Sequence, residues 1–164
     1  MDDLDGRLIE LFANDPRIGV LEASRRLGVA RGTVQARLDK LTQRGVITGW
    51  GPELSPEALG YPVTAFLTLE IRQDTGGREG RPGGHDAVGA HLASIPEVLE
   101  AHTITGAGDM WARVVARSNT DLQRVIDQVL KNPVIVRSST VIALATQVPY
   151  RVLPLAVEEG GFTG

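Results

Sequence analysis

Basic side chains crowd into one short stretch of an otherwise acidic chain. Between residues 25 and 44, six basic residues stand against one acidic residue, Asp39, whereas the whole chain carries a formal net charge of -3. A local excess of positive charge of this kind needs an anionic partner, and the phosphates of double-stranded DNA are the obvious one. The residues of this stretch that we expect to contact DNA are Arg25, Arg26, Arg31, Thr33, Gln35, Arg37, Lys40 and Arg44.

The spacing of apolar residues indicates how these side chains would be presented. Apolar residues recur at helical intervals on both sides of a break at Gly28. Two short amphipathic helices joined by a glycine-containing turn form a helix-turn-helix, whose second helix enters the major groove. We expect the start of that helix to meet base edges with Arg31, Thr33, Gln35 and Arg37 and the remaining basic residues to meet phosphate. For Arg37 an ion pair inside the domain, for example with an acid on the first helix, is the alternative.

A glycine-rich turn in the second half of the chain offers the groups that a small zwitterion needs. In Gly106-Ala107-Gly108-Asp109 the two glycines let a ligand approach the backbone closely, so free N–H groups can hold a carboxylate. The Asp109 carboxylate can hold an ammonium, and together these are the charges of a free amino acid. A plain hairpin turn ending in aspartate accounts for the same residues. The candidate effector-binding residues are Thr103, Thr105, Gly106, Ala107, Gly108, Asp109 and Thr140.

Composition argues against several other kinds of site. The 164 residues contain no cysteine and only three scattered histidines, so we expect neither a disulfide framework nor a metal site. The turn lacks the third glycine and the lysine of nucleotide-binding loops, so we expect no cofactor. No apolar run approaches the roughly 20 residues that span a bilayer, and the N-terminal residues MDDLDGR lack the apolar region of a signal peptide. These features predict a cytoplasmic protein without membrane contact.

Periodicity and turn residues predict two domains. A first helix stops at Asn14-Asp15-Pro16, and the helix-turn-helix ends at Gly45, with a short strand at Val46-Ile47-Thr48 that would make the domain winged. Glycine and proline then crowd together, which predicts a hinge. We therefore predict a helix-turn-helix domain in residues 1–50, a hinge in 51–62, a ferredoxin-like domain in 63–150 and a C-terminal tail in 151–164.

The second domain opens with a strictly alternating strand, Val63 to Ile71. Residues 73–84 contain five glycines and predict a surface loop. Further strands are expected at 98–105, 110–117 and 134–146, and helices around 88–95 and 122–130, the latter capped by Thr120 and Gln123. The order βαββαβ is that of the ferredoxin-like arrangement, and the fold class is therefore α+β.

The ordered set of residues resembles the Lrp/AsnC family of feast/famine transcription regulators. The resemblance is carried by Leu4-Asp5, Arg7 to Ile9, Asp15-Pro16-Arg17, Val34, Arg37, Leu41, Gly45 to Ile47, Leu59-Gly60, Pro96 to Val98, Gly106, Asp109 and Thr140. It implies regulation of amino-acid metabolism, a small amino-acid effector bound between subunits, and a homo-oligomer in which dimers assemble further, here expected to reach an octamer. Ala30 departs from the family, which often has a serine there to cap the recognition helix.

Two other functions fit parts of the pattern. Sirohaem decarboxylases resemble this family in architecture, but they need no basic recognition helix. An architectural DNA-binding protein would bind DNA broadly and ignore effectors, and the net negative charge of this chain speaks against it. We therefore expect a sequence-specific regulator that is not an enzyme.

Overall fold

A computed structural model describes residues 1–72 and 84–161, and the chain divides into two compact units. The first unit combines Met1–Glu53 with Val148–Gly164, and the second unit is Leu54–Gln147. The C-terminal residues, predicted to be a tail, therefore belong to the first unit, and the second unit ends before residue 150. Periodicity did not reveal this because it does not say what a short helix packs against. Of the predicted loop at 73–84, residues 73–83 lie outside the described residues.

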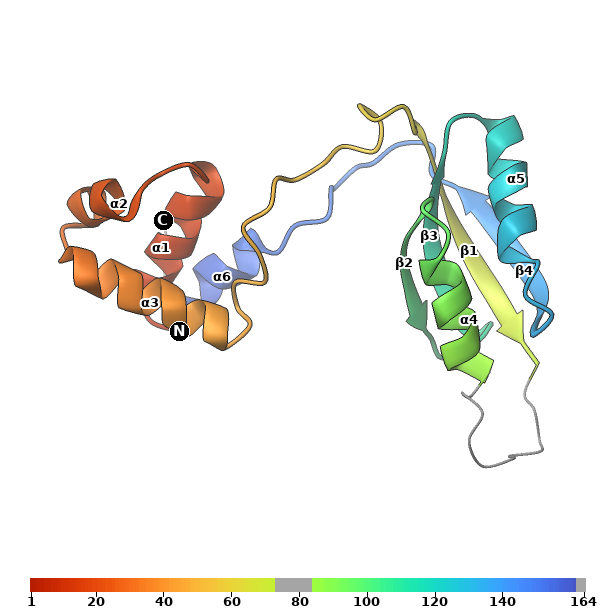
Figure 1. Ribbon diagram of the computed structural model, residues 1–164, viewed down its shortest axis with the longest axis horizontal. Coiled ribbons are helices and arrows are strands. Elements are labelled where there is room, and N and C mark those ends of the chain that lie inside the picture. Colours follow the sequence, from red (N-terminus) through yellow and green to blue (C-terminus); the bar gives the residue numbers. More distant parts are fainter. Residues whose placement is uncertain (73–83, 162–164) are drawn as a thin grey trace. The chain divides into compact units, whose positions relative to one another are not determined.

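Helices make up the regular structure of the first unit in its described residues (Figure 1). They are α1 (Asp3–Asn14), α2 (Val20–Leu27), α3 (Arg31–Gln43) and α6 (Leu153–Glu159). Gly28 ends α2 in the left-handed conformation, with φ +68°, and so makes the turn into α3. Leu8, Ala23 and Val34 from the first three helices are fully buried against one another. This arrangement confirms the predicted helix-turn-helix.

The starts of α1 and α3 are capped differently. Asp2 and Asp5 form a capping box at the start of α1, each side chain accepting a hydrogen bond from the backbone N–H of the other, at 3.0 and 3.2 Å. At the start of α3, Ala30 makes no side-chain cap, which costs about 1 kcal/mol relative to serine. Gly45, with φ +70°, ends α3. The strand predicted at Val46–Thr48 is wrong, because these residues form a bend and a loop with no neighbouring strand among the described residues of this unit.

Helix α6 docks on α1 through a contact between two glycines. A Cβ atom on Gly160 would lie 2.9 Å from the Cα atom of Gly6, and a Cβ atom on Gly6 would lie 3.2 Å from the Cα atom of Gly160. The two backbones therefore approach more closely than larger residues would permit. Pro154 stands in the first turn of α6, where its missing N–H costs no helical hydrogen bond.

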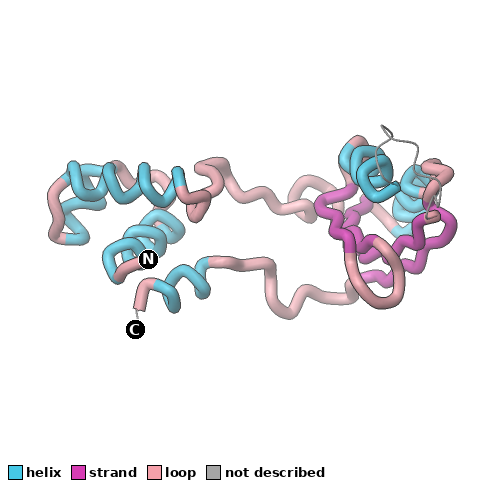
Figure 2. The backbone as a smooth tube through the Cα atoms, turned by 90° about the horizontal axis from the view of Figure 1, so that it is seen from below, coloured by secondary structure: helices cyan, strands magenta, loops and turns pink. Residues whose placement is uncertain are grey.

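The second unit is a four-stranded antiparallel sheet with two helices on one face. Its elements are β1 (Val63–Ile71), α4 (Gly84–Ala93), β2 (Val98–Thr103), β3 (Met110–Ala116), α5 (Asn119–Val129) and β4 (Ile135–Ile142). The strand order is β2-β3-β1-β4, with every pair antiparallel. Figure 2 shows both helices on the same side of the sheet. This is the predicted ferredoxin-like arrangement.

The core of the second unit lies between this sheet face and the helices. Ala65, Leu67 and Leu69 of β1 are fully buried there, as the alternation predicted, and each buried leucine contributes about 1.5–3 kcal/mol of hydrophobic stabilisation.

The predicted cap of α5 is wrong by two residues, because Ser118 is the N-cap and accepts a hydrogen bond from the N–H of Asp121 at 3.1 Å. Strand β4 ends at Ile142, four residues earlier than predicted.

Candidate nucleic-acid interface and effector turn

Helix α3 buries one face and exposes the other. Val34, Leu38 and Leu41 are buried, which turns the intervening residues toward solvent. The predicted DNA contacts that are exposed on α3 or directly after it are Arg31, Thr33, Gln35, Lys40 and Arg44. The side-chain amide of Gln35 donates to Asp39 at 2.9 Å, an exposed hydrogen bond that a base edge could replace. A single polar surface of α3 is thus available to a duplex.

Acidic neighbours offset part of the basic stretch. The guanidinium groups of Arg25 and Arg26 approach Glu22 at 3.8 and 3.2 Å, and Arg26 also lies 3.6 Å from Asp15. Glu22 precedes the stretch counted in the sequence and Asp15 follows α1, so a linear charge count overlooks both. Arg31, Lys40 and Arg44, which are predicted DNA contacts, take part in no ion pair among the described residues.

Arg37 ties α3 to the start of α1. Its Nη1 atom pairs with the carboxylates of Asp2 and Asp5, at 2.9 Å from Oδ1 of Asp5, whose side chain is buried. The hydrogen bonds that Arg37 donates to Asp2 and, with a smaller effect, to Asp5 raise the pKa of Arg37. The bond from Arg37, followed by the bond from the backbone N–H of Asp5, lowers the pKa of Asp2. This is the intra-domain ion pair considered as the alternative role of Arg37. Its contact with a base stays a prediction.

The turn between β2 and β3 has a shape that requires glycine. Gly106 and Gly108 have φ +100° and +104°. A Cβ atom on Gly108 would lie 2.4 Å from Cγ2 of Thr68 on β1, whereas a Cβ atom on Gly106 would meet open space. Oδ2 of Asp109 accepts a hydrogen bond from the backbone N–H of Ile71 at 2.7 Å. The Asp109 carboxylate thus holds the turn against the end of β1, a structural role that the sequence did not suggest.

The fold separates two of the predicted effector residues. Thr103 ends β2 and Thr140 lies in β4, and these strands are the two edges of the sheet. With β3 and β1 between them, the two threonines are roughly 14 Å apart across the sheet. Thr103 and Thr105 lie at the turn itself, together with Ala107. The turn itself reaches β1 through Gly108 and Asp109, and β1 pairs with the strand of Thr140, so a role for Thr140 beside the turn stays a prediction.

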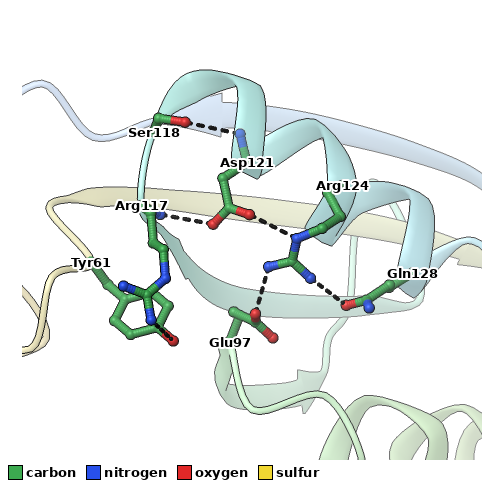
Figure 3. Close-up of polar contacts among 7 residues, drawn as sticks. All are labelled: Tyr61, Glu97, Arg117, Ser118, Asp121, Arg124 and Gln128. Atoms are coloured by element: carbon green, nitrogen blue, oxygen red, sulfur yellow. Dashed lines mark hydrogen bonds and ion pairs between the residues drawn. The ribbon is translucent and has the colours of Figure 1, made fainter.

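A polar network at the start of α5 holds Tyr61, which stands two residues before β1 (Figure 3). The guanidinium carbon of Arg117 lies 4.5 Å from the ring centre of Tyr61, and its Nη2 donates to the tyrosine hydroxyl at 3.1 Å. Asp121 accepts from the backbone N–H of Arg117 and from Nε of Arg124, at 2.9 and 2.7 Å. Arg124 also reaches Glu97 at 2.6 Å. Sequence reasoning missed this network, because Tyr61 and Glu97 are distant in the chain from the arginines that they contact.

These bonds shift the protonation equilibria of the network. The hydrogen bond from Arg124, followed by that from the backbone N–H of Arg117, lowers the pKa of Asp121. Asp121 and then Glu97 raise the pKa of Arg124. Since both shifts favour the charged forms, the network is an ion-paired cluster at neutral pH.

Neither a metal cluster nor a membrane span occurs in residues 1–72 and 84–161. Within them, no group of three or more histidine, aspartate or glutamate side chains is positioned to hold a metal ion, and no helix is both long and apolar enough to cross a bilayer. His91 has a structural contact instead. Its Nε2 lies 3.0 and 3.1 Å from the carbonyl oxygens of Gln128 and Val129, which links α4 to the end of α5.

Two family models match successive parts of the chain. The AsnC-type helix-turn-helix domain matches residues 1–42, and the Lrp/AsnC ligand binding domain matches residues 64–153. The chain belongs to the Lrp/AsnC family. The match places the exposed face of α3 in the DNA-binding domain of Lrp/AsnC proteins and the turn between β2 and β3 in their ligand-binding domain.

Individual Lrp/AsnC proteins resemble the chain over most of their length. A helix-turn-helix-type transcriptional regulator of Pyrococcus horikoshii is 28% identical over 155 residues, covering 94% of this chain and 97% of the relative. The regulatory protein AsnC of Escherichia coli is 31% identical over 126 residues, covering 77% of this chain and 78% of its own.

Solved Lrp/AsnC structures share the fold. The structure of E. coli AsnC matches with a TM-score of 0.82 at 28% identity, covering 94% of this chain and 99% of that one. A feast or famine regulatory protein from M. tuberculosis, complexed with L-methionine, matches with a TM-score of 0.76 at 26% identity, covering 92% and 97%. The protein is therefore a transcriptional regulator of the Lrp/AsnC type.

Proposed function

We propose that this regulator reads operator DNA with α3. We further propose that an amino-acid effector binds at the turn between β2 and β3, where subunits meet, and modulates DNA binding. The observation that carries the DNA part is the exposed polar face of α3, where Arg31, Lys40 and Arg44 form no ion pair among the described residues. The target genes would serve amino-acid or related metabolism. No observation favours a sirohaem decarboxylase, and the relatives compared above are transcriptional regulators.

The exposed residues of α3 divide by position. Arg31, Thr33 and Gln35 lie in its first half, the part that reaches base edges when a recognition helix enters the major groove. Lys40 and Arg44 lie near its end and would contact phosphate, as would Arg25 and Arg26 once they exchange their exposed contacts with Glu22 for DNA. Arg37 would act first as a positioning residue, because its pairing with Asp2 and Asp5 holds α3 on α1.

The DNA part is tested with duplexes enriched by the protein from a random library. Arg31→Ala should relax sequence preference, at a cost of about 1–3 kcal/mol for the base recognition that this side chain provides. Lys40→Ala should instead weaken binding to all duplexes and reduce the salt dependence of the association constant by about 0.9 in slope. Lys131→Ala removes the same charge from the exposed turn after α5 and is the matched control. Equal effects of Lys40→Ala and Lys131→Ala would refute the assignment of α3.

The effector part rests on the turn. Exposed Gly106 and its neighbours leave backbone groups open to a ligand carboxylate, while Asp109 uses Oδ2 for Ile71 and has Oδ1 for a ligand ammonium. The M. tuberculosis relative was solved with L-methionine, which supports an amino acid as the class of ligand. Thr140 would line such a site from β4, the strand that pairs with β1 beside the turn.

Thermal denaturation with each proteinogenic amino acid tests this part, since a ligand of the native state raises the melting temperature. Asp109→Asn is the informative variant, because asparagine keeps an oxygen for the N–H of Ile71 but loses the charge. We expect an unchanged melting temperature without ligand and loss of the ligand-induced shift. A full shift in Asp109→Asn would place the pocket elsewhere. A regulator that no amino acid stabilises would favour the architectural, effector-independent alternative.

We also propose that the sheet face opposite the helices joins two copies into a dimer, and that dimers assemble further into an octamer. On that face Phe66 and Trp111 stack with ring centres 5.2 Å apart, and the neighbouring Val141 is 60% exposed. An uncovered aromatic face in the middle of a sheet marks an interaction surface. Light scattering should report an oligomer at micromolar concentration, and Phe66→Glu should dissociate it. A monomeric wild-type protein would refute the proposal.

A further inference from the structure

The DNA-binding unit contains a cavity that its helix-turn-helix does not use. The cavity has a volume of about 390 Å³ and lies between α1 with the turn after it and the segment from residue 47 to residue 53. Its lining includes Ile9, Phe12, Pro16, Ile47, Trp50 and Glu53. A volume of this size lies within the range of small-molecule pockets, which begins at about 300 Å³.

The lining has the chemistry of a site for an organic cation. The rings of Phe12 and Trp50 meet edge to face, with centres 5.5 Å apart, so they form an aromatic corner. Trp50 is 56% exposed, so a ligand that enters the cavity can cover it. Among the described residues that line the cavity, Glu53 is the only charged one, and its charge is negative. Aromatic faces and a carboxylate both attract an ammonium group, whereas the apolar side chains accept a hydrocarbon body.

We propose that this cavity is a second ligand site, which takes a small primary amine with an apolar body. It differs from the effector turn in both position and charge preference, because it belongs to the other unit and its described lining residues include an anionic side chain and no cationic one. Its ligand bridges α1 and the segment that follows α3. An occupied site therefore holds residues 47–53 on α1 and restrains the chain that leaves the recognition helix.

Tryptophan fluorescence tests the proposal in the full-length protein. The chain has two tryptophans, and Trp111→Phe leaves Trp50 as the reporter. The probes are phenethylamine, phenethyl alcohol and phenylpropionate, which have the same apolar body with a cationic, neutral or anionic end. We expect a saturable change in Trp50 emission with phenethylamine. The alcohol and the carboxylate should bind at least about fivefold more weakly, because an exposed charge pair contributes up to about 1 kcal/mol, which corresponds to about that factor in affinity. In Glu53→Gln the preference for the amine should disappear.

Each other outcome overturns the proposal. Equal affinity for the alcohol and the amine would make the cavity a non-selective apolar site. An unchanged preference for the amine in Glu53→Gln, with helix content intact by circular dichroism, would remove the carboxylate from the site. If no probe changes Trp50 emission and acrylamide quenching of Trp50 falls as protein concentration rises, a second copy of the chain covers the cavity. If no probe acts and quenching is independent of concentration, there is no ligand site.

Discussion

The turn between β2 and β3 contains two glycines that differ in one respect, and this difference allows a sharp test. Gly106 and Gly108 have nearly the same φ, +100° and +104°, so an alanine at either position takes a φ that L-residues rarely adopt. We expect the resulting strain to cost about 1–2 kcal/mol, reduced by up to about 1 kcal/mol because alanine also lowers the entropy of the unfolded chain. Gly106→Ala, whose new methyl group meets open space, should therefore destabilise the second unit by about 1 kcal/mol.

Gly108→Ala should cost more for a steric reason. Its methyl carbon would lie 2.4 Å from Cγ2 of Thr68, within a strand that cannot easily move, and overpacking of this kind adds about 1–3 kcal/mol. The prediction is a gap of that size between the two variants. Urea denaturation in a Trp50→Phe background measures it, because Trp111 lies directly opposite Thr68 on β3 and reports on this unit.

A double-mutant cycle identifies the cause of the gap. Thr68→Ser removes Cγ2, so it should recover most of the extra cost in the Gly108→Ala protein while having little effect alone. Equal stabilities of the two glycine variants, or no recovery by Thr68→Ser, would refute the reasoning. The turn would then relax around the new methyl group, and its shape would not depend on the contact with β1.

Three other contacts give further predictions. Arg37→Ala should lower both the melting temperature and the operator affinity, because buried Asp5 loses its partner and α3 loses its ion pair with α1. Reduced affinity with an unchanged melting temperature would indicate a direct DNA contact instead. The pKa of Asp121 lies below its ordinary 3.8, mainly because of Arg124, so ionised Asp121 stabilises the fold above pH 3.8 and this contribution is lost as the pH falls through the folded-state pKa. Asp121→Asn should therefore lower the free energy of unfolding at neutral pH. Denaturation between neutral and acid pH should also show a smaller fall of that free energy in the variant than in the wild type. Gly160→Ala should displace α6 from α1 at a cost of about 1–3 kcal/mol by thermal denaturation, and a wild-type melting temperature would contradict the glycine contact.

Local patterns in the sequence determined most of the elements. The helical spacing around Gly28 predicted α2 and α3, and the strict alternation from Val63 to Ile71 predicted β1 with the correct buried face. Both patterns are short-range, because they record which side of one element faces a core. The ferredoxin-like topology followed from the order of elements, since few arrangements of βαββαβ bury one sheet face under two helices.

Tertiary structure decided which side chains meet. Arg37 pairs with carboxylates more than thirty residues away, Asp15 after α1 reaches Arg26 on α2, and Asp109 anchors a turn to β1. Thr103 and Thr140, grouped by their type, lie on the two edge strands of the sheet. Helix α6 is too short for its sequence to reveal that it returns to α1. These pairings depend on distances set by the whole fold, and neither residue spacing nor charge counts along the chain contain that information.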